Sequence, residues 1–93
     1  MILVMGRYNI DPEQREAFLT FARQMVAQER QQPGCLAFDI FEDVTTANAF
    51  LMLEQWENED VLDAHTNSED FERSDAALNE FTVGEPSWDE YQF

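Results

Sequence analysis

What the chain lacks narrows its class before any motif is considered. It has no lysine, one cysteine and one histidine in 93 residues. A lone cysteine, Cys35, excludes an internal disulfide, and one His with one Cys excludes a Cys/His metal cluster. We expect Cys35 to be a small buried apolar side chain rather than a redox centre. The sequence also has no HExxH, CxxC, P-loop or G-x-S-x-G pattern, so the usual signals of metalloproteases, nucleotide-binding proteins and serine hydrolases are missing.

Long apolar runs are missing as well. No stretch approaches the roughly 18 apolar residues that a membrane-spanning helix needs. The apolar residues 2–5 are too few for a signal peptide, and no basic residue precedes them. We therefore expect a cytoplasmic protein with no membrane partner.

Positive charge is scarce. Five basic residues, all of them Arg, face 20 acidic ones, which gives a net charge of −15. Such a chain repels nucleic acid and anionic lipid. Two interpretations remain: an acidic surface that meets a basic partner, or a halophilic protein of a high-salt cytoplasm, where salt screens self-repulsion over a few ångströms. We favour the second.

The length and the aromatic content indicate one folded domain. Residues 1–93 leave no room for a second domain or a linker. The chain is 44% hydrophobic and holds eight Phe, two Trp and two Tyr, which argues against disorder. A chain of this size buries only about 65% of its unfolded surface. Association of two copies would bury more.

The pattern along the chain predicts the element order βαββαβ, with the second helix broken in two. Strands are expected at residues 2–8, 35–43, 49–57 and in the last segment, 81–93; helices are expected at 11–32, 58–65 and 68–79. Asp11, Asn58 and Ser68 are the expected N-caps, and Pro33-Gly34 ends the first helix. On the second strand, Leu36, Phe38, Ile40 and Glu42 are expected on one face. This order is that of the α+β ferredoxin-like fold, with helices on one face of an antiparallel sheet.

The third strand and the helix after it carry the candidate site. Strand alternation places Phe50, Met52, Glu54 and Trp56 on one face. The only histidine, His65, follows on the next helix. A carboxylate, an indole and an imidazole are thus expected around one cavity, although a core role remains open for Trp56 and His65.

Two further residues are candidate pocket residues. Phe71 begins a helix face of small residues, and this face is expected to form either a tight helix contact or a pocket wall. Arg7 lies near the end of the first strand. It is expected either to pair with a carboxylate such as Glu54 or to contact the substrate. Asp39 interrupts an apolar strand pattern, and the sequence leaves open whether it faces solvent, an interface or the pocket.

Three groups of residues carry a resemblance to a known family. Glu54-Gln55-Trp56-Glu57, Leu62-Asp63-Ala64-His65 and Ser68-Glu69-Asp70-Phe71 resemble the pattern of the antibiotic biosynthesis monooxygenase (ABM) family, and its quinol monooxygenase branch is nearest. The resemblance implies a homodimer whose two sheets pack into a dimeric α/β-barrel. It also implies oxidation of a small phenolic or quinol substrate by O2 without metal, flavin or other cofactor.

The resemblance also implies residue roles. The family's Trp falls on Trp56 and its His on His65, with His65 as acceptor of the phenolic proton. Glu54 would orient His65 or pair with Arg7. The resemblance departs from the haem-degrading relatives, because Asp75 stands near the position of their His and Asn9 lies only at the end of the first strand. Haem is therefore not an expected ligand.

Two functions other than that of an oxygenase remain open. One is a non-catalytic dimeric module that binds a small aromatic or apolar ligand in the same pocket. The other is a regulatory partner protein that uses its acidic surface. The second alternative requires binding that salt abolishes, which conflicts with the halophilic interpretation.

The halophilic interpretation makes a direct prediction. The melting temperature should rise between dilute buffer and molar KCl, because salt screens the repulsion among the acidic side chains. Thermal unfolding followed by circular dichroism measures this, with a protein of near-zero net charge as control. Equal stability in the two buffers would contradict the interpretation.

Overall fold

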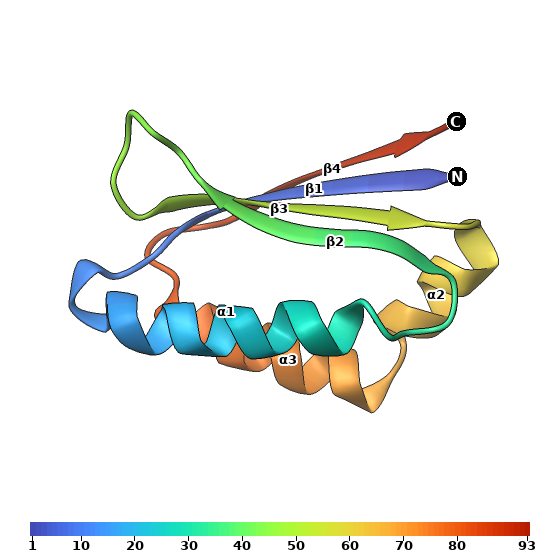
Figure 1. The fold of residues 1–93 in the computed structure, drawn as a ribbon, viewed down its shortest axis with the longest axis horizontal. Coiled ribbons are helices and arrows are strands. Elements are labelled where there is room, and N and C mark those ends of the chain that lie inside the picture. The colour runs from blue at the N-terminus through green and yellow to red at the C-terminus, as the bar shows by residue number, and fades with distance from the viewer.

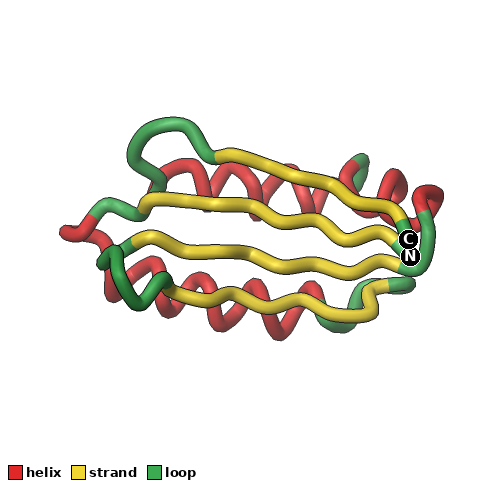
Figure 2. Tube along the Cα trace, turned by 90° about the horizontal axis from the view of Figure 1, so that it is seen from above, coloured by secondary structure: helices red, strands yellow, loops and turns green.

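A computed structural model describes the whole chain, Met1–Phe93. Its elements follow the expected order: β1 (Ile2–Asn9), a 3-10 turn η1 (Pro12–Gln14), α1 (Arg15–Glu29), β2 (Cys35–Glu42), β3 (Ala49–Trp56), α2 (Glu59–Thr66), α3 (Glu69–Phe81) and β4 (Ser87–Gln92). The four strands form one antiparallel sheet in the order β2-β3-β1-β4. All helices lie on one face of the sheet (Figures 1 and 2). The ferredoxin-like α+β fold is confirmed.

The helix boundaries follow local chemistry. Asn58 Oδ1 accepts the amide proton of Val61, and Ser68 Oγ accepts that of Phe71, as the expected N-caps require. Asp11 caps the 3-10 turn instead of the α-helix, because its Oδ1 accepts from the Glu13 amide. Gly34 ends the loop after α1 with φ of +78°, and a Cβ there would lie 2.2 Å from a Val61 methyl, so only glycine fits.

Two expectations along the chain are wrong. The expected fourth strand began at residue 81, but Phe81 is the last residue of α3 and packs against Phe18 and Phe21. Leu36 was expected on the face of Phe38, but a β-bulge between Cys35 and Ala37 interrupts the alternation and leaves Leu36 52% exposed.

The core lies between the sheet and the helices. It is built from inward-facing residues of the first three strands, one stripe of α1, a leucine of α3 and the residue that follows β1: Tyr8, Ile10, Phe18, Ala22, Met25, Phe38, Phe50, Met52 and Leu78. The opposite face of the sheet has no helix over it (Figure 1). That open face carries apolar side chains from three strands, among them Leu3, Met5, Leu51, Leu53 and Phe41.

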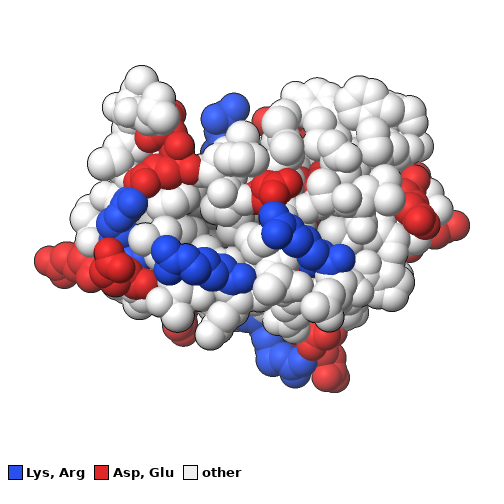
Figure 3. All heavy atoms as spheres, viewed as in Figure 1, with Lys and Arg blue, Asp and Glu red and all other residues white.

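Charged side chains lie mainly outside the core. Figure 3 shows arginines beside acidic side chains on the visible face. Arg30 pairs with Asp39 at 2.7 Å, which settles Asp39 as an ion-pair residue on the edge strand. Arg15 forms two hydrogen bonds to the carboxylate of Glu42. None of the helices is both long and apolar enough to cross a lipid bilayer.

Candidate functional site

A buried carboxyl, Glu54, lies at the centre of the site. Alternation along β3 points Glu54 and Trp56 toward the helices, where Glu54 is 6% exposed and Trp56 is fully buried. The Trp56 indole N–H donates a hydrogen bond of 3.0 Å to Oε1 of Glu54. No other hydrogen bond within the protein reaches this carboxyl. Trp56 therefore fixes one oxygen and leaves the other available.

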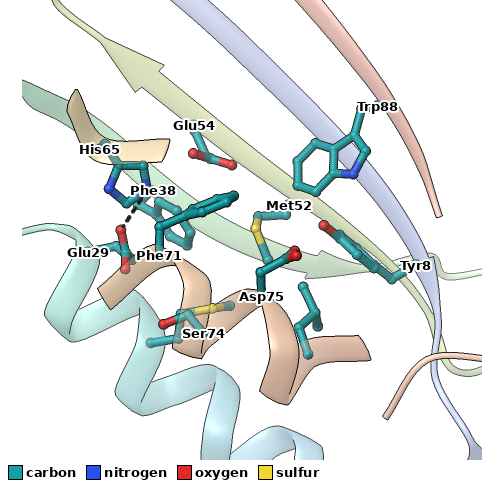
Figure 4. A pocket seen from close by; sticks show the side chains of 12 residues that line it. Tyr8, Glu29, Phe38, Met52, Glu54, His65, Phe71, Ser74, Asp75 and Trp88 are labelled. Carbon is teal, nitrogen blue, oxygen red and sulfur yellow. Dashed lines mark ion pairs between the residues drawn. The ribbon is translucent and has the colours of Figure 1, made fainter. Parts of the chain in front are cut away.

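The imidazole of His65 packs directly on this unit. Its ring stacks on Trp56 with a centroid distance of 4.4 Å and meets Phe71 edge-on at 5.3 Å. Its Nε2 lies 3.2 Å from Oε2 of Glu29, on α1 (Figure 4). The two atoms approach closely without an aligned hydrogen bond, since Glu29 Oε2 and His65 Nδ1 have no hydrogen-bond partner. Three elements, β3, α2 and α1, thus place two carboxyls around one imidazole.

These side chains surround a small cavity beneath the sheet. Its volume is about 30 Å³. The lining comes from all three layers of the fold: Tyr8, Met25, Glu29, Phe38, Met52, Glu54, His65, Phe71, Ser74, Asp75, Leu78 and Trp88. Figure 4 shows Glu54, His65 and Tyr8 directed toward this space. We refer to it as the inner cavity.

A second hollow, the outer groove, lies on the other side of the same wall. It has a volume of about 320 Å³ and is lined by Val4, Glu54, Leu62, Thr66, Phe71, Trp88, Asp89 and Glu90. Glu54, Phe71 and Trp88 border both spaces. The Trp88 ring lies over Gly6, where a Cβ would come within 2.6 Å of it. The absence of a side chain at Gly6 thus leaves room for the Trp88 ring in the wall between the two spaces.

Burial sets the electrostatics of the site. It raises the pKa of Glu54 from 4.5 to about 7, and the nearby Glu29 carboxyl contributes to the same shift, although the Trp56 hydrogen bond opposes it. Burial also raises the pKa of Glu29 and lowers that of His65. Both directions favour uncharged groups. The site is therefore a set of buried acids and bases held toward their uncharged forms, and Glu54 is the one whose pKa lies near 7.

The structure brings together most of the expected site residues and separates two of them. Glu54, His65, Met52 and Phe71 line the inner cavity, whereas Trp56 lies behind His65 and supports it. No group of three or more His, Cys, Asp or Glu side chains is arranged to hold a metal ion.

The two separated residues are Arg7 and Phe50. Arg7 is exposed and, as an odd-numbered residue of β1, lies on the open face of the sheet, so it does not reach Glu54. Phe50 shares the face of Glu54 but lies too far along β3. It packs against Phe18 at 4.8 Å in the core.

Sequence reasoning missed three residues of the site. Glu29 continues the buried stripe of α1 after Phe18, Ala22 and Met25, so a carboxyl at helical spacing among apolar residues was a usable signal. Tyr8 shares the alternation of Ile2 and Gly6 on β1. Trp88 had no such signal, because its position depends on the register Gly6–Trp88 between β1 and β4.

Comparison with known proteins identifies the family of the chain. The fold and the site define a small ferredoxin-like protein with a buried carboxyl–imidazole pocket. The family model described as antibiotic biosynthesis monooxygenase matches residues 1–77. The chain therefore belongs to the ABM family.

Individual relatives are similar to different extents. "Uncharacterized protein sll1783" of Synechocystis is 34% identical over 64 residues, which are 69% of this chain but only 44% of that protein. "Putative monooxygenase YcnE" of Bacillus subtilis is 35% identical over 72 residues, 77% of this chain and 76% of that protein. A crystal structure of an antibiotic biosynthesis monooxygenase superposes with a TM-score of 0.90 at 29% identity and covers 100% of this chain and 98% of its own.

The raised pKa of Glu54 predicts a pH dependence of stability. Between pH 4.5, where the carboxyl ionises in the unfolded chain, and about 7, where it ionises in the folded one, folding retains a proton that unfolding releases. The free energy of unfolding should therefore fall as pH rises through this window, by roughly 3 kcal/mol from Glu54 alone. Glu54→Gln should remove that part of the slope.

Urea titrations from pH 4 to 8 measure the effect. The matched control is Glu57→Gln, an exposed carboxyl just beyond β3, which should keep the wild-type slope. Parallel pH profiles for the wild type and Glu54→Gln would show that Glu54 ionises normally in the folded protein.

Proposed function

We propose that this protein is a cofactor-independent monooxygenase that oxidises a small phenolic or quinol substrate with O2. One observation carries the proposal: Glu54, a carboxyl with a pKa of about 7, is held by the Trp56 N–H at the wall between the outer groove and the inner cavity. A base with a pKa near the working pH is efficient in proton transfer.

The groove, and not the inner cavity, is the place for the substrate ring. A cavity of roughly 150 Å³ is the scale that takes a benzene ring, and the inner cavity is about 30 Å³. In the groove, a ring would lie beside Phe71 and Trp88, with Val4 and Leu62 also in reach. Aromatic walls bind such a ring by stacking and edge contacts. Its hydroxyl would point to Glu54.

The reaction requires little from the protein beyond binding and proton transfer. The free oxygen of Glu54 accepts the hydroxyl proton, and the resulting phenolate is electron-rich enough to reduce O2. A bond forms between oxygen and a ring carbon, and loss of water from the peroxide leaves a quinone. For a quinol, one O2 supplies one oxygen atom to the ring and one to water, and the product is a hydroxyquinone.

The remaining buried groups support Glu54. Trp56 orients the carboxyl through its N–H, and His65 packs on the Trp56 ring. Glu29, close to His65 Nε2, is a second acid that opposes ionisation of Glu54. Glu29 therefore helps to keep the pKa of Glu54 raised, and His65 positions the Trp56 ring that holds Glu54. In this proposal Glu54, and not His65 as the sequence predicted, is the primary proton acceptor.

We also propose that two copies associate through the open face of the sheet. Phe41 and Tyr91 are 52% and 47% exposed there, beside Leu51 and Leu53 of β3. An uncovered apolar sheet face is unfavourable in water. A second copy of the same face would bury it and would leave the helix-side pocket unchanged.

The oxygenase proposal predicts a loss of activity in Glu54→Gln. Oxygen uptake with a panel of hydroquinones, measured after chelator treatment and in molar KCl, should fall at least about 100-fold in kcat/KM, the usual scale for losing a general base. In the wild type, kcat/KM should rise with pH through about 7, because only the ionised carboxyl accepts a proton.

The control for activity is again Glu57→Gln, which should retain wild-type rates. Unchanged oxygen uptake in Glu54→Gln would contradict the assignment of Glu54 as the base. Quenching of Trp fluorescence by quinols with no oxygen consumed would instead support the alternative of a non-catalytic binding module.

The association proposal predicts a change of mass on mutation. Leu53→Glu places a charge in the middle of the open face and should convert a dimer into a monomer at micromolar concentration, because a buried unpaired charge is costly. Analytical ultracentrifugation measures this. Ala76→Glu, on the exposed side of α3, should remain dimeric; a monomeric wild type would refute the interface.

A further inference from the structure

The two spaces beside Glu54 differ in size, and the smaller one has no assigned occupant. The inner cavity measures about 30 Å³ and the outer groove about 320 Å³. A single water requires roughly 10–15 Å³, and benzene was taken up by an engineered cavity of roughly 150 Å³. The inner cavity therefore excludes an aromatic ring but has room for a diatomic molecule.

The lining of the inner cavity suits an uncharged diatomic gas. Apolar side chains make up most of it, including Met25, Phe38, Met52 and Leu78. Dioxygen has no dipole and transfers favourably from water into apolar surroundings. The cavity also shares Glu54, Phe71 and Trp88 with the groove, so its occupant would lie next to a ring bound there.

One polar atom in this lining is unexplained. The Tyr8 side chain is 3% exposed, its hydroxyl has no hydrogen-bond partner, and Figure 4 shows that hydroxyl directed into the cavity. Trp88 packs edge-on against the Tyr8 ring at 5.3 Å, which holds its orientation. Burial and the carboxylates of Asp75 and Glu54 raise the pKa of Tyr8, so the hydroxyl stays protonated and acts as a donor.

We propose that the inner cavity is the dioxygen site of this protein and that the Tyr8 hydroxyl donates a hydrogen bond to oxygen as it is reduced. The inference rests on the proposed oxygenase function. An ionised quinol in the groove passes one electron across the shared wall. It becomes a semiquinone radical, and O2 becomes superoxide. Superoxide then moves from the cavity past the shared residues Glu54, Phe71 and Trp88 to the ring. The two radicals combine there to form the carbon–oxygen bond, and the Tyr8 proton stays on Tyr8.

The donor matters most after electron transfer. Neutral O2 accepts hydrogen bonds weakly, whereas superoxide is an anion, and hydrogen bonds to anions are about twice as strong as neutral ones. A preorganised donor of this kind stabilises charge that develops during the reaction. Of the ionisable groups that face the cavity, Glu29 and His65 are held toward their neutral forms and Glu54 is neutral once it has taken the proton. The Asp75 carboxylate on α3 opposes the anion, and the Tyr8 donor offsets it.

The four methionines allow a test that needs no activity. Met25 and Met52 line the cavity, whereas Met1 is 44% exposed and Met5 lies on the open face. With methyl-labelled methionine and a few bar of O2, paramagnetic relaxation should be strongest at the methyls of Met25 and Met52. Ser74→Leu, which fills the cavity from α3, should reduce it to the level of Met5.

Kinetics at varied O2 concentration provide the second test. Ser74→Leu should raise the KM for O2 about fivefold, and Tyr8→Phe should lower kcat/KM for O2 roughly tenfold, the scale of one lost hydrogen-bond donor. Both variants should bind quinol anaerobically with wild-type Kd. Ala76→Leu, a leucine on the exposed side of the same helix, should have no effect, and thermal unfolding checks that all variants fold.

The outcomes separate this inference from the function on which it rests. Methyls of Met25 and Met52 that relax no faster than that of Met5 would show a cavity that holds water only and would overturn the dioxygen site. Normal quinol oxidation with an unchanged O2 dependence in both Tyr8→Phe and Ser74→Leu would overturn it too, while the oxygenase assignment stands. No uptake by the wild type with any quinol would overturn the function and this site together.

Discussion

The hydrogen bond from Trp56 to Glu54 is the interaction on which the site depends. A buried carboxyl is costly unless it is neutral or paired with a donor, and Glu54 has one donor and no cation. That single N–H is enough to orient the carboxyl but not to keep it ionised, so its pKa stays near 7. An Arg in place of the indole would keep Glu54 ionised with a low pKa and would make it a weak base. A purely apolar neighbour would hold it permanently protonated.

The fold supplies this balance by joining a strand end to a short helix. Trp56 is the last residue of β3, and α2 begins three residues later under an Asn58 cap. The short connection places His65 back over Trp56 within two helical turns. Glu29 then approaches from the C-terminal turn of α1, which packs beneath the same end of the sheet. Each group is held by a regular element, so the site needs no long loop to form it.

Local patterns were sufficient to predict the fold and one side of the site. Strand alternation predicted that Glu54 and Trp56 share a face, and capping residues predicted where α2 and α3 begin. They did not predict contacts that depend on strand register or helix packing, such as Trp88 over Gly6 or Glu29 beside His65. The predictions that Arg7 and Phe50 line the pocket were wrong for a related reason. Residue type and spacing along the chain do not show how far a side chain lies from Glu54 across the sheet or along β3. The bulge at Leu36 likewise has no local pattern that distinguishes it from a regular strand.

The surface charge and the buried site fit the same chemistry. A net charge of −15 produces a negative potential that disfavours the approach of phenolate anions and favours neutral phenols. For the proposed reaction, the substrate would therefore arrive protonated, and an internal base would be required to generate the reactive anion in a place without competing water. The same potential stabilises protons on buried carboxyls, which acts in the direction of the raised pKa of Glu54 and Glu29. The acidic exterior and the raised pKa of Glu54 therefore act in the same electrostatic direction. Salt would weaken the effect of the surface charges far more than the effect of burial.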